Sequence, residues 1–355
     1  MPEIVGIIIF TFVLSLMAVA LMIRLSHKKS WYDKINERKI HTGNVPRLGG
    51  VGFVSVFIIM AFFITFKFPT GHLGIRFLPA LCAFILIFIA GVYDDFRALA
   101  PRHKLFIQII AALCVVIPDY TFHRLFFFDI GFFSELNWIR YPLSFLWLVG
   151  LTNAINLIDG VDGLAGGISA LIALIYAGIL VILGDTGSTA LLGLCLAAAL
   201  GGFLIFNAPF PKAKIFMGDG GSQFLGFILA LLPLIDKGER GYTALPLPYA
   251  AALLIIPIFD TIAAMWRRIR DGRRIDSPDR SHIHHKLMNL GLNARGVDGV
   301  LYGLQILLGG VVFLSLTVKG IRSLRLLCVA YLIGIVFFTA IHFMNQKVKN
   351  QEPEG

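Results

Sequence analysis

The amino-acid sequence predicts an all-α, polytopic membrane protein with about eleven transmembrane helices. Hydrophobic residues make up 57% of the 355 positions and charged residues only 15%, whereas soluble domains carry about 25% charged residues. Apolar runs of about 17 to 25 residues recur along the whole chain, and each is long enough to cross a bilayer core of about 30 Å. We therefore expect one transmembrane domain, residues 1–345, followed by a short cytoplasmic tail, residues 346–355.

Eleven segments have the length and apolarity of membrane spans, and the third and fourth are short. They are 3–25, 48–66, 77–93, 104–118, 139–157, 165–183, 189–206, 221–235, 244–266, 298–318 and 323–344. The first segment has no basic flank before it and no small-residue cleavage site after it, so we expect a retained span and not a cleaved signal peptide.

The distribution of basic residues predicts the orientation of these spans. Loops after odd-numbered spans, together with the C-terminal tail, hold 22 of the 31 Lys and Arg residues. Cytoplasmic loops carry such an excess, so the N-terminus is expected outside and the C-terminus in the cytoplasm of an inner (plasma) membrane. The formal charge of +10 then belongs to membrane loops, and no nucleic-acid partner is expected.

Acidic residues beside membrane spans are costly, and they are usually retained for function. The first such cluster is Asp94 and Asp95 at the end of the third span, followed by Leu99 and Lys104 in the order D-D-x-x-x-L-x-x-x-x-K. Adjacent carboxylates repel each other and need a cation or a shared proton. Taken alone, this pair could equally be two solvated loop acids that cap the next helix.

The second cluster, N-A-I-N-L-I-D-G-V-D-G-L-A-G-G, begins at Asn153 at the end of the fifth span. Asn156, Asp159 and Asp162 follow at intervals of three, which places them on one face if the segment is helical. The interleaved glycines allow tight turns and close approach of backbone to a ligand. A polar turn between two spans would explain one of these acids, but not two Asn and two Asp together.

The third cluster is F-M-G-D-G-G-S, from Phe216 to Ser222, after the seventh span. Glycines around Asp219 suit backbone amides beside a phosphate and a carboxylate on a metal ion. An ordinary turn with a helix cap is the alternative.

Two basic loops complete the set. The loop after the ninth span carries five arginines and then Arg280, His282, His284 and His285. Most of the arginines are explained by the membrane orientation alone, whereas three histidines within four residues suit either a metal or phosphate groups. The first cytoplasmic loop carries Lys39, His41 and Arg47, which are candidates for a lipid phosphate or a nucleotide and equally for plain membrane anchors.

All five clusters follow odd-numbered spans, so the charge distribution places them on one membrane face. Carboxylates, a hard metal ion, cations and backbone donors are the components of phosphoryl transfer. The order and content of these motifs resemble the polyprenyl-phosphate N-acetylhexosamine-1-phosphate transferases, over about residues 31–290. The loop H-I-H-H resembles the GlcNAc-1-phosphate branch, because the phospho-MurNAc-pentapeptide branch carries three adjacent histidines.

The resemblance implies a reaction and its partners. A UDP-N-acetylhexosamine, by default UDP-GlcNAc, would donate its sugar 1-phosphate to polyprenyl (undecaprenyl) phosphate, releasing UMP. Mg²⁺ is the expected cofactor, with Mn²⁺ as the alternative, and a homodimer is expected because dimers are common in the family. The muramyl activity remains an alternative, as do an intramembrane prenyltransferase, which would need two well-separated Asp-rich motifs, and a transporter, which would place acids at mid-membrane.

The resemblance also implies roles for individual residues. Asp219 and Asn156 would hold the metal, Phe216 would stack on uracil, and Asp162 would lie near the uracil edge. Catalytic roles fall to a set of acids and histidines: Asp94, Asp95, Asp159, His284 and His285. Asp94 is the candidate that deprotonates or orients the lipid phosphate. Further substrate contacts are expected from Asn153, Lys104, Arg280, His282, Lys39 and Arg47.

Overall fold

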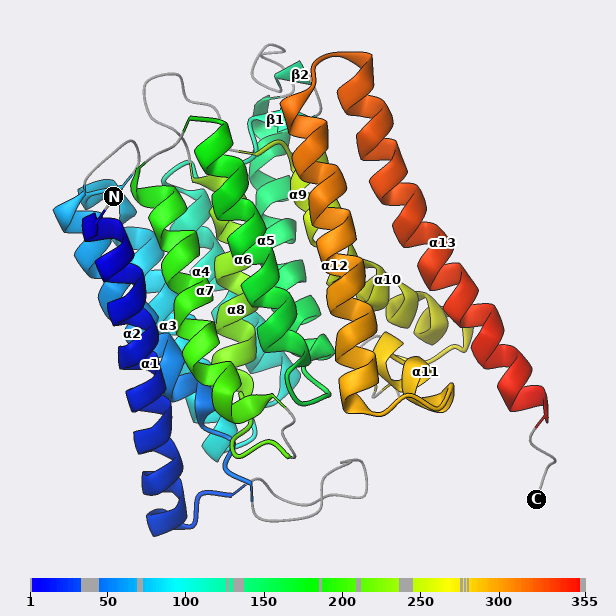
Figure 1. Ribbon diagram of the computed structural model, residues 1–355, viewed down its shortest axis with the longest axis horizontal. Helices are drawn as coiled ribbons and strands as arrows, with labels where there is room; N and C mark the ends of the chain where they lie inside the picture. Colours follow the sequence, from blue (N-terminus) through cyan, green and yellow to red (C-terminus); the bar gives the residue numbers. More distant parts are fainter. Residues whose placement is uncertain are drawn as a thin grey trace.

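The computed structural model describes most of the chain as a bundle of helices (Figure 1). The described residues are 2–32, 45–68, 73–125, 128–129, 137–184, 187–208, 212–235, 245–274, 277, 279 and 281–351. Lys39, His41 and Arg280 lie outside them, so their predicted roles stay predictions.

Long helices make up the N-terminal and central part of the bundle. They are α1 (Pro2–Lys29), α2 (Gly49–Lys67), α3 (Leu78–Phe96), α4 (Pro101–Val116), α5 (Arg140–Ile158), α6 (Leu164–Ile182), α7 (Ser188–Asn207) and α8 (Asp219–Leu231). Short 3₁₀ turns, η1 (Ile75–Phe77), η3 (Asn137–Ile139) and η4 (Leu232–Leu234), adjoin three of them. The two-residue strands β1 (Arg124–Leu125) and β2 (Phe128–Asp129) form a small antiparallel hairpin.

The C-terminal part contains α9 (Leu247–Leu253), α10 (Ile255–Arg270), α11 (Ile283–Asn289), α12 (Ala294–Thr317) and α13 (Ile321–Gln351). The predicted tail therefore begins inside α13, because this helix continues through residues 346–351. Figure 1 shows the start of α1 at one end of the bundle and the last turns of α13 at the other.

Each of the eleven predicted spans contains helix, and the protein is a multi-pass membrane protein. Within the described ranges, eight helices are long and apolar enough to cross a bilayer, or nine if α9 and α10 form one broken span. The helices α4 and α8 fall below that length, so the number eleven and the direction of insertion stay predictions.

The predicted continuous span 244–266 is wrong in one respect, because α9 and α10 meet at an angle of 84°. Pro257 explains the break: its ring clashes with the carbonyl of Leu253, four residues earlier, and it has no N–H to donate. The freed Leu253 carbonyl accepts the side-chain amide of Gln305 at 3.0 Å. The break turns α10 out of the bundle, toward the short helix α11 (Figure 1).

Glycines bring the start of α8 into contact with α2 and α3. A Cβ atom on Gly50 would lie 2.4 Å from the backbone nitrogen of Gly221, and one on Gly91 would lie 2.6 Å from the Cα of Gly220. Small residues permit such close backbone approach between membrane helices. Asp219, the first residue of α8, is thereby placed between the ends of α2 and α3.

Candidate active site

The predicted acids divide into two structural roles, and Asp95 has an anchoring one. Its carboxylate accepts the backbone N–H groups of Asp219 at 2.8 Å and Gly220 at 3.0 Å. It also accepts the Nε and Nη2 hydrogens of Arg47 at 3.1 and 2.8 Å. A carboxylate at a helix N-terminus satisfies free N–H groups and the helix dipole. Because Asp95 is engaged by four donors and its side chain is 1% exposed, a direct catalytic role does not fit; we reassign it to holding α8.

Asp94 contacts the other cation of the site. Its Oδ2 atom forms an ion pair with Lys104 Nζ, which also lies 3.2 Å from Asp219 Oδ2. The backbone N–H of Leu99 donates to Asp94 Oδ1 at 2.6 Å. Lys104 thus bridges acids from two helices, which satisfies the need of the Asp94–Asp95 pair for a cation and confirms that the D-D motif and Lys104 belong to one site.

Asn156 joins the second motif to the third. Its Nδ2 atom donates to Asp219 Oδ1 at 2.8 Å and to Ser222 Oγ at 2.7 Å. The turn before α8 is tight: Gly218 has φ +76°, and a Cβ atom there would lie 2.2 Å from the Arg47 carbonyl oxygen. Only glycine fits this position, so Gly218 is required to aim Asp219 at Asn156 and Lys104.

The oxygen atoms of Asp219 and Asn156 suit a hard divalent cation that is bound by few protein ligands. Among the described residues, no group of three or more His, Cys, Asp or Glu side chains converges as a metal cage. Mg²⁺ usually takes one or two protein carboxylates and completes its shell with substrate phosphates and water. Asp219, 24% exposed at its side chain, and its neighbour Asn156 fit that pattern.

The segment from Asp159 to Gly163 is a turn whose last residue is hydrogen-bonded to two other helices. The N–H of Gly163 donates to Asn207 Oδ1 at 2.9 Å, and its carbonyl accepts the hydroxyl of Tyr302 at 2.5 Å. Desolvation by the surrounding protein raises the pKa of half-buried Asp159 to about 8, and the negative charges of Asp219, Asp95 and Asp162 add to the shift. Asp159 therefore holds a proton at neutral pH when no cation is near.

Phe216 pairs through its backbone with the segment Pro46–Gly49 that leads into α2. Its N–H donates to the Pro46 carbonyl at 2.7 Å, and its carbonyl accepts from Gly49 N–H at 2.9 Å. This pairing places Arg47 next to the start of α8. The Phe216 side chain stays partly exposed, as a stacking surface for a base requires.

Asn153 lies one helical turn before Asn156 and is engaged inside the bundle. It exchanges amide hydrogen bonds with Gln108 at 2.7 and 3.3 Å, and Gln108 also donates to Gln223 Oε1 at 3.2 Å. This network supports the helix face that carries Asn156, and direct contact of Asn153 with a substrate stays a prediction.

The histidine loop lies against the Asp159 turn. A Cβ atom on Gly160 would lie 2.4 Å from His284 Nε2, so only glycine admits this ring. Burial lowers the pKa of His284 to about 3, with His285 adding to the effect. His284 is therefore a neutral imidazole that can donate or accept hydrogen bonds but carries no charge, and its predicted contact with phosphates stays a prediction. His285 lies beside it, with ring centroids 4.3 Å apart, and His282 is buried.

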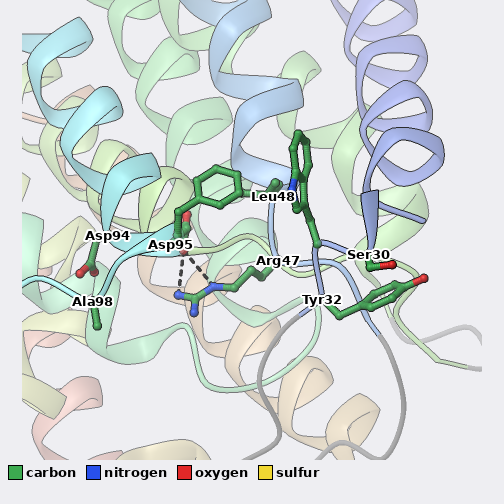
Figure 2. Close-up of a pocket in the computed structure, with 9 residues that line it drawn as sticks. Ser30, Tyr32, Arg47, Leu48, Asp94, Asp95 and Ala98 are labelled. Carbon is green, nitrogen blue, oxygen red and sulfur yellow. Dashed lines mark hydrogen bonds and ion pairs between the residues drawn. The ribbon is translucent and has the colours of Figure 1, made fainter. Parts of the chain in front are cut away.

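A cavity of about 220 Å³ opens beside the Arg47–Asp95 pair (Figure 2). In Figure 2 Asp95 turns toward Arg47, whereas Asp94 points away from it. The cavity is lined by Ser30, Trp31, Tyr32, Arg47, Leu48, Asp94, Asp95, Phe96 and Ala98. Charged groups therefore adjoin an aromatic wall in which Trp31 and Phe96 pack edge to face, 5.4 Å apart.

Several residues that shape the site carry no motif signal. Gln108, Asn207 and Tyr302 contact the motif residues Asn153 and Gly163 from other helices. A polar side chain inside a long apolar run was the available signal, and it applies to Gln108 and Asn207.

Comparison with known proteins agrees with this geometry. The sequence model of glycosyl transferase family 4 matches residues 77–236. The chain is 34% identical to the probable undecaprenyl-phosphate N-acetylglucosaminyl 1-phosphate transferase of Bacillus subtilis, over 96% of this chain and 94% of that protein. It is 31% identical to the undecaprenyl-phosphate alpha-N-acetylglucosaminyl 1-phosphate transferase of Escherichia coli K12, over 77% of this chain and 73% of the relative. The Pasteurella multocida protein of the same name is 32% identical, over 81% of this chain and 80% of the relative.

Proposed function

We propose a function from the premise that this chain belongs to glycosyl transferase family 4, together with the undecaprenyl-phosphate N-acetylglucosaminyl 1-phosphate transferases. The protein transfers N-acetylglucosamine 1-phosphate from UDP-GlcNAc to undecaprenyl phosphate, releases UMP and depends on Mg²⁺. The observation that carries the proposal is the meeting of Asp94, Lys104 and Asp219 at one point, where anionic groups and a cation alternate.

The reaction exchanges one phosphoanhydride bond for another. An oxygen of the lipid phosphate attacks the β-phosphorus of UDP-GlcNAc, and the bond from that phosphorus to the bridging oxygen breaks. The electron pair leaves with UMP, and the lipid carries a diphosphate. A phosphate monoester is mostly dianionic at neutral pH, so the acceptor is already nucleophilic, and the main obstacle is repulsion between the two anions.

The residues of the site address that obstacle. Lys104 and Arg47 supply positive charge on either side of Asp219. Asp219 and Asn156 would hold Mg²⁺, which would supply positive charge to offset that of the phosphates. Asp94, on Lys104, receives the last proton of the acceptor phosphate or orients it.

The nucleotide lies along the Asp159 turn. Phe216 stacks on the uracil ring, Asp162 accepts from its edge, and neutral His284, together with His285 beside it, donates to phosphate oxygens. The acceptor, a charged head on an apolar chain, suits the cavity in which Asp94 and Arg47 adjoin Trp31 and Phe96 (Figure 2). The site lies at the cytoplasmic face of the inner membrane, because the loops on the predicted side of the site hold 22 of the 31 Lys and Arg residues.

Release of UMP by the purified protein in detergent tests this function. Wild type should release UMP only when undecaprenyl phosphate, UDP-GlcNAc and a divalent cation are all present, with Mn²⁺ compared against Mg²⁺. Asp219→Ala should reduce the rate to background, and Asp94→Asn should lower kcat by about 10²–10⁴-fold, as for a lost general base. UMP release with another UDP-hexosamine alone would overturn the sugar assignment. If no UDP-sugar leads to release of UMP, the proposed reaction class is overturned in favour of a prenyltransferase or a transporter.

A further inference from the structure

Asp260 is a buried acid in the middle of α10 to which none of the motifs or roles above assigns a task. It is 3% exposed. Its Oδ2 atom lies 2.8 Å from His282 Nδ1, and its Oδ1 atom accepts the backbone N–H of Ile283 at 2.7 Å. Both carboxylate oxygens therefore contact the histidine loop.

A second acid–base contact attaches the same loop to the same helix. Arg267 lies two turns after Asp260 on α10, and its Nε and Nη2 atoms donate to Asp279 Oδ2 at 3.0 and 2.6 Å. Asp279 Oδ1 in turn accepts the N–H of Ser281 at 2.9 Å. Asp279 and residues 281–283 are thus fixed to α10 at two points. The break at Pro257 directs α10 away from the rest of the bundle.

A series of side-chain contacts connects Asp260 to the Asp159–Gly163 turn. The rings of His282 and His284 are nearly parallel, 5.9 Å apart with 5° between their planes. His284 in turn lies against Gly160, the residue after Asp159. Asp260, His282, His284 and Gly160 therefore form one row of contacts that ends at the candidate active site.

The chemistry of Asp260 also selects one form of His282. A carboxylate only accepts hydrogen bonds, so Nδ1 of His282 must carry the hydrogen and Nε2 faces the other side of the ring. An asparagine in this place has nearly the same shape, but its amide can donate to Nδ1 and favour the opposite tautomer. A glutamate keeps the acceptor chemistry and changes the length.

We propose that Asp260 is a positioning residue of the transfer reaction, which acts through His282 to hold His284 against the Asp159–Gly160 turn. The effect of Asp260 on the reaction rate rests on the proposed function. Its effect on the position of the histidine loop rests on the geometry alone.

Kinetics of substituted protein test the consequence. Asp260→Asn should lower kcat/KM for UDP-GlcNAc by about 10–100-fold, the usual effect of losing a partner that orients a functional histidine. Asp260→Glu should retain more activity than Asp260→Asn, although asparagine is the closer match in shape. In a His282→Ala background Asp260→Asn should change the rate less than about twofold. Asp271→Asn, an exposed acid at the end of α10, is the matched control and should behave as wild type.

A chemical measurement tests the placement without turnover. His284 is 2% exposed and should react slowly with diethyl pyrocarbonate in wild type, whereas Asp260→Ala should increase its modification rate several-fold. Exposed His103 is the internal reference and should not change. Unchanged reactivity of His284, or an Asp260→Asn enzyme as active as Asp260→Glu, would overturn the proposal. A wild type inactive on UDP-GlcNAc would contradict the proposed function, and His284 reactivity would then still decide the role of Asp260.

Discussion

The carboxylate of Asp95 accepts the backbone N–H of Asp219 across 2.8 Å, so an acid from α3 caps the helix that begins with the proposed metal ligand. The two neighbouring acids of the D-D motif therefore differ in kind. Asp95 holds the start of α8 in place, and Asp94 pairs with Lys104.

Substitution of the two acids should separate these roles. Asp95→Ala should lower the free energy of unfolding by about 3–5 kcal/mol, because it leaves Arg47 without its buried partner and two N–H groups unsatisfied. Asp94→Asn should lose activity with a much smaller change in stability. Thermal unfolding in detergent, read beside UMP release, measures both. Equal melting temperatures for Asp95→Ala and wild type would contradict the assignment.

Close helix packing at the start of α8 should tolerate no added methyl group. Gly50→Ala would place a Cβ atom 2.4 Å from the Gly221 backbone nitrogen, so α2 must move from α8 at a cost of about 1–3 kcal/mol. Gly150→Ala is the matched control, since nothing lies within 4 Å of its added Cβ. The first variant should unfold at lower temperature and lose activity, and the second should do neither. A fully active Gly50→Ala protein would show that Asp219 needs no such placement.

Tyr302 should affect substrate binding as well as stability. Its hydroxyl donates to the Gly163 carbonyl at 2.5 Å, and the hydroxyl of Tyr331 donates to the Pro248 carbonyl at 2.7 Å, in another part of the molecule. Replacing either by Phe removes one hydrogen bond, worth about 1 kcal/mol. Only Tyr302→Phe should raise the KM for UDP-GlcNAc. If both variants change KM equally, the Asp159–Gly163 turn is not part of the nucleotide site.

Binding of Mg²⁺ should release a proton from Asp159. Its raised pKa, about 8, means that the carboxyl group is mostly protonated below that pH, while a divalent cation favours the ionised form. Affinity for Mg²⁺ should therefore increase as the pH rises from about 6.5 to about 8.5. Calorimetry in two buffers of different ionisation enthalpy measures the proton release, which Asp159→Asn should abolish. A pH-independent affinity would contradict the proximity of Asp159 to the metal.

Much of the site was predictable because membrane helices make polar residues conspicuous. Asp94, Asn156 and Asp219 stand out against apolar runs, and the distribution of Lys and Arg predicts that the runs they follow end on one side of the membrane. The structure confirms that these three residues, with Lys104, belong to one cluster.

What the sequence could not predict depends on geometry between helices. The spacing of Asp94 and Asp95 does not show which acid turns toward α8. The 84° break before α10 follows from Pro257, but proline in membrane helices is often accommodated without a break. Asp260 lies in an ordinary-looking span, and only the turn of α10 brings it to His282.

The fate of the β-phosphorus tests the central claim most directly. UDP-GlcNAc labelled in its β-phosphate should be supplied to the purified protein with undecaprenyl phosphate and Mg²⁺, and the lipid and aqueous phases should be separated. Transfer of the sugar 1-phosphate predicts the label in the lipid, in equal amount to the UMP released. Label that stays in the water phase as UDP, while the sugar alone moves to the lipid, would contradict the account.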